Sequence, residues 1–192
     1  SAIAQAHFSG VPLLVLGGRA PAYRWGSGSL QELDHPPLLA PVTRYAATAT
    51  AVEAIPTVVD EALRAATTPH RGPAFVDVPM DHLFSRAVAA APASPSRVRS
   101  TPDAEEVAEV ARLLVQAERP VLVLGSDVWL DGAEDAAARL VEAVGIPTVT
   151  NGMGRGLLPQ GHPLLVSKDR STAFGAADLV VVVGTPLDFR LG

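Results

Sequence analysis

The 192-residue chain contains no cysteine and no long apolar run. The lack of cysteine excludes disulfides, thiolate chemistry and cysteine-ligated zinc. No apolar run approaches the roughly 20 residues that a membrane-spanning helix needs, so no membrane partner is expected. Lysine is scarce too, and no lysine and arginine cluster marks a nucleic-acid surface. With no cysteine and no visible signal peptide in residues 1–10, we expect a cytoplasmic protein; its net charge is −5.

What the chain does have is enough apolar material for a sizeable core. Hydrophobic residues make up 48% of it and charged residues 18%. Short apolar runs alternate with helical patterns, which predicts an α/β fold with parallel sheets covered on both faces. We expect two incomplete parallel-sheet units, residues 1–88 and 103–192, joined by an Ala/Pro/Ser linker over residues 89–102. Both ends look cut, which predicts a fragment of a longer polypeptide.

The first unit is expected to contain three short strands. They are predicted at residues 11–16, 42–46 and 74–78, with the chain entering the first one almost directly from Ser1. Residues 19–41 are rich in Gly, Pro and Ser and predict a long loop, a kind of segment that is usually functional or disordered. Thr50 and Glu53 have capping-box spacing ahead of a helix that has Pro56 in its first turns.

The second unit begins with a helix at Pro102, where Asp103 and two glutamates lie near the positive end of the helix dipole. Strands are predicted at residues 121–124, 146–150 and 179–183. Helices are predicted at residues 133–144 and 171–177, and Gly145 ends the first of these.

Glycine-containing turns follow all three strands of the second unit: Gly125, Asn151-Gly-Met-Gly154 and Gly184. The carboxyl edge of an open parallel sheet is where ligands bind, and helix N-termini there can hold phosphate. The glycines do not form the G-x-G-x-x-G fingerprint, so an ordinary dinucleotide site is not supported. The pattern leaves two interpretations open, a nucleotide site or glycines that only turn strands into loops.

Two charged residues lie near the same edge. Arg170 can pair with a diphosphate and Asp188 can accept hydrogen bonds from a ribose. The alternative is that both are solvated loop charges.

The long loop of the first unit holds a second candidate site. Gln31, Glu32, Asp34 and His35 are close together there, and Glu or His can act as a general acid or base. The alternative is a solvated loop that packs against a partner. Asp77, Asp81 and His82 follow the last strand, but their spacing fits no metal template, and Asp81 is expected to cap a helix.

Several segments, in order, resemble a known family. The segments Val-Pro-Leu-Leu-Val-Leu-Gly-Gly, Gly-Ser-Leu-Gln-Glu-Leu-Asp and Gly-Pro-Ala-Phe-Val-Asp-Val-Pro-Met-Asp resemble the latter part of the pyrimidine-binding domain of thiamine-diphosphate enzymes, in the acetolactate synthase branch. The segments Arg-Pro-Val-Leu-Val-Leu-Gly, Gly-Ile-Pro-Thr-Val-Thr-Asn-Gly-Met-Gly-Arg-Gly, Pro-Gln-Gly-His-Pro and Gly-Thr-Pro-Leu-Asp-Phe-Arg-Leu-Gly resemble the first part of that family's central domain. The resemblance covers essentially the whole chain.

For the first unit, the resemblance implies one catalytic residue. Gln31 matches a glutamine that lies near the reacting carbons, and Leu30 stands where the family usually has Phe. The family's cofactor-activating glutamate lies upstream of Ser1 and its magnesium–diphosphate motif lies downstream of Gly192. The chain by itself is therefore expected to lack the main binding motifs for thiamine diphosphate and Mg²⁺.

For the second unit, the resemblance implies FAD or ADP as a possible nucleotide of the central domain. The matching cofactor-binding positions are Gly125, Asn151, Gly152, Met153, Gly184, Pro186, Asp188 and Arg190, together with Arg170. Pro186 replaces an arginine that is common in the FAD-binding branch, and the segment from Arg170 to Asp178 looks more like the decarboxylase and lyase branch.

The implied parent reaction is decarboxylation of a 2-oxo acid followed by carboligation. A thiamine-diphosphate-dependent 2-hydroxyacyl-CoA lyase or oxalyl-CoA decarboxylase is the alternative, and a non-catalytic nucleotide-binding module is the second alternative. The expected partners are a small 2-oxo acid or acyl-CoA substrate and further copies of the full-length chain, as a dimer or tetramer.

Overall fold

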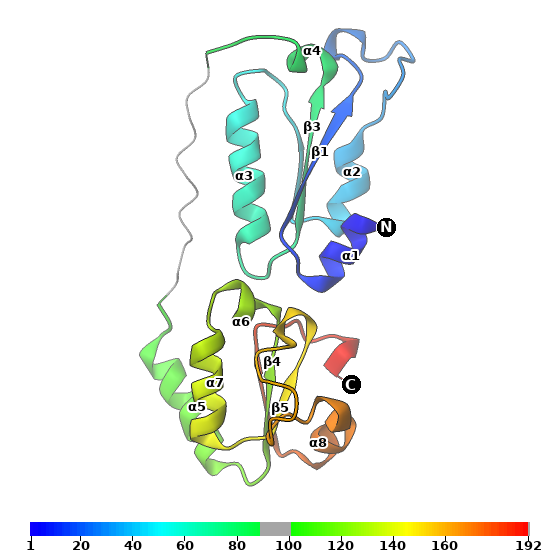
Figure 1. Cartoon of the computed structure of the whole chain (residues 1–192). Coiled ribbons are helices and arrows are strands. Elements are labelled where there is room, and N and C mark those ends of the chain that lie inside the picture. The colour runs from blue at the N-terminus through cyan, green and yellow to red at the C-terminus, as the bar shows by residue number, and fades with distance from the viewer. Residues whose placement is uncertain (89–100, 192) are drawn as a thin grey trace. The chain divides into compact units, whose positions relative to one another are not determined.

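The computed structural model describes residues 1–88 and 101–191, apart from the side chain of Arg190. The chain divides into two compact units, unit 1 (Ser1–Val98) and unit 2 (Arg99–Gly192), which are shown in Figure 1. The predicted linker lies outside the described residues except for Thr101 and Pro102. Its role as a linker, and the assignment of the flanking segments to two enzyme domains, stay predictions.

Unit 1 is a three-stranded parallel sheet in the order β1-β3-β2. Its strands are β1 (Leu13–Arg19), β2 (Tyr45–Thr48) and β3 (Pro73–Pro79). The helices are α1 (Ala2–Ser9), α2 (His35–Leu39), α3 (Ile55–Thr67) and α4 (Met80–Leu83), with short 3-10 turns η1 (Ala22–Arg24) and η2 (Ala40–Val42).

The side chains of the central strand β3 differ in character between the two faces of this sheet. Ala74, Val76 and Val78 point to one face and form an apolar cluster with α3. Successive side chains alternate along a strand, so Phe75 and Asp77 point to the other face. Figure 1 shows α3 on one side of the sheet and α1 and α2 on the other. The α3 face is therefore a conventional core, whereas the opposite face carries a buried charge.

Unit 2 is also a three-stranded parallel sheet, in the order β5-β4-β6. Its strands are β4 (Pro120–Leu124), β5 (Thr148–Thr150) and β6 (Leu179–Val183). The helices are α5 (Ala104–Gln116), α6 (Ser126–Leu130), α7 (Glu134–Val144) and α8 (Arg170–Ala176), with 3-10 turns η3 (Gly152–Gly154), η4 (Ser167–Asp169) and η5 (Phe189–Leu191).

Strand β4 lies at the centre of unit 2 and supplies both of its cores. Leu122 and Leu124 join the cluster that contains α7, while Val121 and Val123 join the cluster that contains α8. Figure 1 shows α5 and α7 on one side of the sheet and α8 on the other. The predicted fold class, α/β units built on parallel sheets, is confirmed. Among the described residues, no helix is long and apolar enough to cross a bilayer.

Four local predictions are wrong, each for a physical reason. The chain enters β1 from helix α1, not directly from Ser1. Strand β1 continues through its two glycines to Arg19 because Gly17–Arg19 pair with Asp77–Pro79 of β3. The predicted long loop contains helix α2, which has prolines in its first turn. The N-cap of α3 is Ala54 and makes no side-chain bond, so the capping box is not formed.

The sequence predicts that helix α5 begins at Pro102, but it begins at Ala104 and Asp103 is its N-cap. A side-chain oxygen of Asp103 accepts hydrogen bonds from the backbone N–H groups of Glu105 and Glu106, at 2.8 and 3.2 Å. Replacing Asp103 by Ala should therefore lower the free energy of unfolding of unit 2 by about 1 kcal/mol.

The measurement is urea denaturation followed by the fluorescence of Trp129 in a Trp25→Phe background. Glu142→Ala, which removes an exposed carboxylate within α7, is the control and should change the free energy by less than about 0.5 kcal/mol. Equal midpoints for the two variants would contradict a stabilising cap at Asp103.

Candidate functional site

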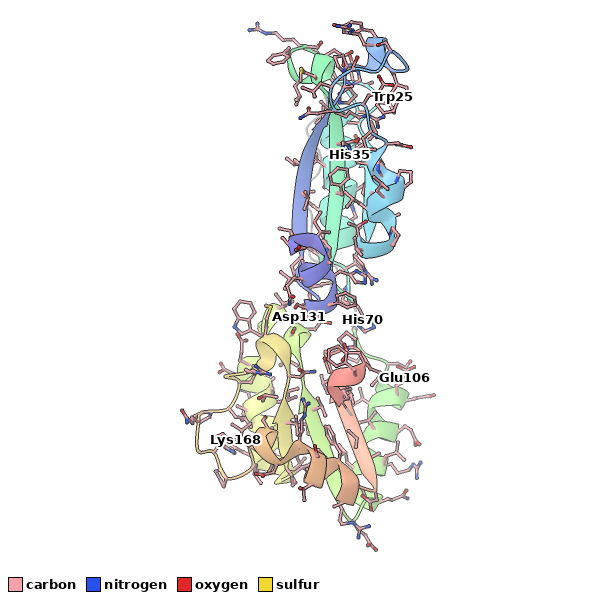
Figure 2. All side chains as sticks on the ribbon, turned by 90° about the vertical axis from the view of Figure 1, so that its right-hand side faces the viewer. Trp25, His35, His70, Glu106, Asp131 and Lys168 are labelled. Carbon is pink, nitrogen blue, oxygen red and sulfur yellow. The ribbon has the colours of Figure 1, made fainter. Side chains whose placement is uncertain are left out.

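The segment from Ala20 to Asp34, here called the Gln31 loop, joins the end of β1 to the start of α2. Figure 2 looks onto the face of unit 1 that α1 and α2 cover, and shows Trp25 and His35 toward the carboxyl end of the strands. Although most of the loop's side chains are exposed, its backbone is held at several points. The N–H of Ala20 donates to the carbonyl of Gln31 at 3.1 Å, which closes the loop at its base.

Two carboxylates hold the backbone of this loop. The oxygens of Glu32 accept from the N–H groups of Gly26 and Ser29, at 2.8 and 2.9 Å. The Oδ1 atom of Asp81 accepts from the N–H of Ala22 at 3.0 Å. These backbone hydrogen bonds favour the ionised forms and lower the pKa of both carboxyl groups.

These contacts change two expectations about acidic residues. Asp81 does not cap a helix, because its carboxylate instead binds the loop backbone across about 59 residues of sequence. Both oxygens of Glu32 are engaged and its pKa is lowered, so it suits a loop anchor better than a general acid. Among the described residues, Asp77, Asp81 and His82 do not form a metal-binding group. His82 contacts the carbonyl of Ala49 instead, at 3.2 Å.

Gln31 has an unusual backbone conformation. It is the only residue other than glycine among the described residues with a positive φ, at 62°. This left-handed conformation costs a non-glycine residue on the order of 1 kcal/mol, and persists where neighbouring contacts enforce it. Its carbonyl is fixed by the N–H groups of Ala20 and Leu33, while its side chain is exposed. The structure therefore presents the Gln31 amide to solvent from an ordered loop.

A buried charge cluster lies beneath this loop. The carboxylate of Asp77 in β3 is completely buried, and its Oδ2 atom lies 3.0 Å from Nδ1 of His35 and 3.5 Å from a guanidinium nitrogen of Arg19. Arg19 also donates to the hydroxyl of Thr48 at 2.6 Å. Its guanidinium lies over the ring of Trp25, 3.8 Å from the ring centroid.

The second candidate site is the carboxyl edge of the sheet in unit 2. The chain leaves β4 toward β5 on one side and returns to β6 on the other, so the β4–β6 junction is the topological switch point where ligands of such folds bind. Here the two strand ends are in contact. A Cβ on Gly125 would lie 2.4 Å from the carbonyl oxygen of Gly184 and from Cβ of Thr185. Gly125 is therefore required for the close approach of these strand ends.

The polar groups at this edge satisfy one another. The hydroxyl of Ser126 accepts from the N–H of Met153 at 3.0 Å, and Asp127 N donates to the carbonyl of Gly184 at 3.0 Å. The Oδ1 atom of Asn151 accepts from the N–H of Gly152 at 2.8 Å, and its Nδ2 atom donates to the hydroxyl of Thr185 at 3.3 Å. In the first turn of α6, the N–H groups of Asp127 and Val128 thus already bond the carbonyls of Gly184 and Gly125, so they are not available to a phosphate.

The predicted residues of unit 2 fall into two groups. The structure brings together the turns that contain Gly125, Gly152 and Gly184, where Gly125 is buried and Gly152 is exposed. Met153 is partly buried beside them, as is Asp188, whereas Pro186 is exposed.

Arg170 is exposed at the start of α8, three residues after Ser167, whose hydroxyl bonds the end of β5. It therefore lies on the side of β4 away from β6. For Arg190, the backbone belongs to η5.

Asp178, the last residue of the segment that resembles the lyase branch, has a structural role. Its two oxygens accept from the N–H groups of Glu118 and Arg119, at 2.8 and 2.9 Å, and these bonds lower its pKa. The contact lies at the start of β4, on the opposite edge of the sheet from the glycine turns. Asp178 therefore joins two chain segments and does not face the candidate ligand site.

Comparison with known proteins agrees with the resemblance seen in the sequence. Residues 107–192 match the family model described as the thiamine pyrophosphate enzyme, central domain. An acetolactate synthase large subunit from Mycobacterium tuberculosis is 50% identical over 200 residues, which cover 100% of this chain and 36% of that protein.

Residues 107–192 therefore match the central domain of thiamine pyrophosphate enzymes, and the chain is similar to acetolactate synthases over its whole length. A 2-hydroxyacyl-CoA lyase 2 from Caenorhabditis elegans is more distant, at 32% identity over 100% of this chain and 36% of that protein. A solved thiamin diphosphate-dependent enzyme from Mycobacterium smegmatis superimposes with a TM-score of 0.80 at 27% identity, over 94% of this chain and 36% of that chain. The chain thus spans about a third of the length of the relatives it matches.

Sequence reasoning found the Gln31 loop but missed what holds it. No sequence pattern points to Arg19, and the spacing of Asp77, Asp81 and His82 suggests only a metal cluster that fits no template. One signal was available: Asp77 interrupts the apolar run Phe-Val-Asp-Val-Pro of a predicted buried strand. A charge in that position needs a buried partner, and Arg19 at the end of β1 provides one.

The loop should loosen when Glu32 is protonated. Its pKa is lowered from the ordinary value of 4.5, so its stabilising effect is present above pH 4.5 and is lost as the pH falls through the lowered pKa. In a Trp129→Phe background, acrylamide quenching of Trp25 should therefore stay constant above that pH and increase below it.

The variant Glu32→Gln separates this effect from the titration of Asp81, because its amide has one acceptor oxygen for two N–H groups. It should show increased quenching already at pH 7, while Glu53→Gln, at an exposed position, should match the parent. If Glu32→Gln and the parent gave the same quenching at pH 7, the anchoring role of Glu32 would be wrong.

Proposed function

We propose that the polypeptide carrying this chain is a thiamine-diphosphate-dependent enzyme that decarboxylates a 2-oxo acid and transfers the remaining fragment to a second carbonyl. The observation that carries this proposal is the 50% identity to an acetolactate synthase over the whole chain, against 32% and 36% to two 2-hydroxyacyl-CoA lyases. The same proposal includes Mg²⁺, a cytoplasmic location and a homo-oligomeric full-length protein.

Thiamine diphosphate, when bound, supplies the carbanion chemistry of this reaction. The described residues of this chain form no metal-binding group, so none of them is assigned to Mg²⁺. The contribution proposed for this chain is the exposed amide of Gln31. It can donate a hydrogen bond to a substrate carbonyl or carboxylate and accept one from a hydroxyl, and so orient the substrate.

The alternative function is that of a 2-hydroxyacyl-CoA lyase. It is favoured by the several lyases that match the whole chain at about 30% identity, and by Leu30 in place of the expected Phe. Leu30 is almost fully exposed beside Gln31. A side chain in this position can contact a substrate directly, so its replacement is expected to affect substrate choice.

The reaction should be tested in the full-length protein with thiamine diphosphate and Mg²⁺. Formation of acetolactate from pyruvate is expected, and Gln31→Ala should lower kcat/KM by about tenfold or more, the loss of at least one hydrogen bond in the transition state. Residues 1–192 by themselves should form no acetolactate above the blank. Turnover of a 2-hydroxyacyl-CoA but not of pyruvate would favour the lyase, and no turnover of either would contradict both.

We also propose that unit 2 binds ADP or FAD on the exposed part of its carboxyl edge, over Gly152, Met153 and Asp188. Neighbouring strands lie about 4.8 Å apart, so a ligand that contacts both Arg170 beyond β5 and Asp188 beyond β6 must cross β4 and span roughly 10 Å. A nucleoside diphosphate is long enough for this. Its phosphates would be held by side chains, since the N–H groups of Asp127 and Val128 in α6 already have backbone acceptors.

Calorimetry of ADP and FAD binding to the full-length protein tests this site. Arg170→Ala should weaken binding by about tenfold, because a charge-assisted hydrogen bond contributes roughly 1.5–3 kcal/mol. Arg139→Ala, at an exposed position of α7, should leave the affinity unchanged. Absence of binding by the wild type would overturn the nucleotide proposal, and an unchanged affinity in Arg170→Ala would remove that residue from it.

A further inference from the structure

Both ends of the Gln31 loop contact one buried carboxylate. Arg19 is the last residue of β1 before the loop, and His35 is the first residue of α2 after it. The side chains of both reach the same atom, Oδ2 of Asp77, at 3.5 and 3.0 Å. Asp34, the residue before His35, lies 3.7 Å from the same guanidinium nitrogen of Arg19. The two ends of the loop are therefore held together by charge as well as by the backbone.

Burying the charges of this cluster costs free energy. Asp77 is completely buried and Arg19 is 8% exposed, so both charges are removed from water. Such pairs often contribute no more stability than apolar residues of the same size. The second oxygen of Asp77, Oδ1, has no hydrogen-bond partner among the described residues, which adds to the cost. A contribution to stability alone does not account for the cluster.

The cluster is connected to Gln31 by a short path. Directly after Arg19, the N–H of Ala20 donates to the carbonyl of Gln31. The guanidinium of Arg19 also supports the ring of Trp25 in the middle of the loop. On the other side, the ring of His35 packs edge-on against Phe75, with centroids 5.9 Å apart, which fixes the direction of its bond to Asp77. These contacts restrict both the position and the strained φ of Gln31.

We propose that Asp77, Arg19 and His35 form a positioning device, here called the clasp, that holds the Gln31 loop in its observed conformation. Its consequence for catalysis rests on the proposed function. Asp77 accepts hydrogen bonds, so Nδ1 of His35 must carry a proton and act as the donor. In this arrangement the clasp residues do not touch substrate, and they act through the backbone of Gln31.

The first test measures the loop itself, in the 192-residue chain with Trp129→Phe. His35→Ala removes the donor to Asp77, whereas His35→Asn retains an N–H group close to the position of Nδ1. His35→Ala should speed tryptic cleavage after Arg24 by about tenfold and increase acrylamide quenching of Trp25, because cleavage follows the population of the open loop. His35→Asn should restore most of the protection.

The control for this test is His70→Ala, which removes an exposed histidine elsewhere in unit 1. It should match the parent in both measurements. Asp77→Asn should behave like His35→Ala, and the His35 pair decides the result if Asp77→Asn does not fold. Equal cleavage rates and equal quenching in His35→Ala and the parent would overturn the clasp.

The second test measures catalysis in the full-length protein. His35→Ala should lower kcat by about tenfold with little change in KM, and His35→Asn should recover most of it. Because the clasp acts through Gln31, adding His35→Ala to Gln31→Ala should cause no further loss. If the double variant lost kcat by the product of the two single losses, positioning through Gln31 would be contradicted. If the wild-type protein turns over neither substrate, the proposed function fails, and the loop measurements still decide whether the clasp exists.

Discussion

The ion pair between Asp77 and Arg19, together with the hydrogen bond from His35, determines how unit 1 is built at its carboxyl end. Asp77 is on the central strand, so side chains from both edge strands can reach it: Arg19 directly, and Thr48 through Arg19. Breaking a buried pair by removing one partner typically costs about 3–5 kcal/mol, since the other charge is left without compensation. Residues at this end of the sheet therefore depend on one another, and the same contacts order the Gln31 loop that joins β1 to α2.

Carboxylates that accept from backbone N–H groups recur throughout the chain. Glu32 and Asp81 hold the Gln31 loop, Asp103 caps α5, and Asp178 joins the segment before β4 to the end of α8. Each replaces a missing backbone acceptor at a place where the chain leaves regular structure. The acidic residues of this negatively charged chain thus order loops and helix ends. In unit 1 that order extends to a loop that presents the exposed amide of Gln31, and in unit 2 it supports the sheet edge opposite the glycine turns.

The two candidate sites differ in whether their polar side chains are already engaged in contacts within the protein. At the carboxyl edge of unit 2, Ser126 and Asn151 bond neighbouring backbone and side chains, and Gly125 allows two strand ends to touch. Their presence is explained by packing, so any ligand must use the exposed surface of the same turns. In unit 1 the side chain of Gln31 is exposed although its backbone is strained and fixed. Strain that is held by surrounding contacts is a feature of functional segments.

Periodicity and apolar runs predicted most strands and the long helices well, because those elements repeat apolar residues at a fixed spacing. The run Leu-Val-Val-Val-Val of β6 and the helix that ends at Gly145 are as expected, with φ at Gly145 of 65°. The cluster of polar residues marked the loop that contains Gln31, and the family resemblance supplied the catalytic role predicted for that residue. The sequence could not show that Arg19 and His35 meet at Asp77, because that contact depends on strand order. Short helices such as α2 and α6 were missed because four or five residues carry no periodic signal.

Specific carboxylate and backbone contacts order the Gln31 loop. Amide hydrogen exchange of the 192-residue chain at neutral pH, resolved by residue with NMR, measures that order at the individual N–H groups. The N–H groups of Ala20, Ala22, Gly26 and Ser29 each have a defined acceptor and should exchange at least about tenfold more slowly than in an unstructured peptide. Exchange of these four amides at the unstructured rate, with β3 still protected, would show that these contacts do not order the loop.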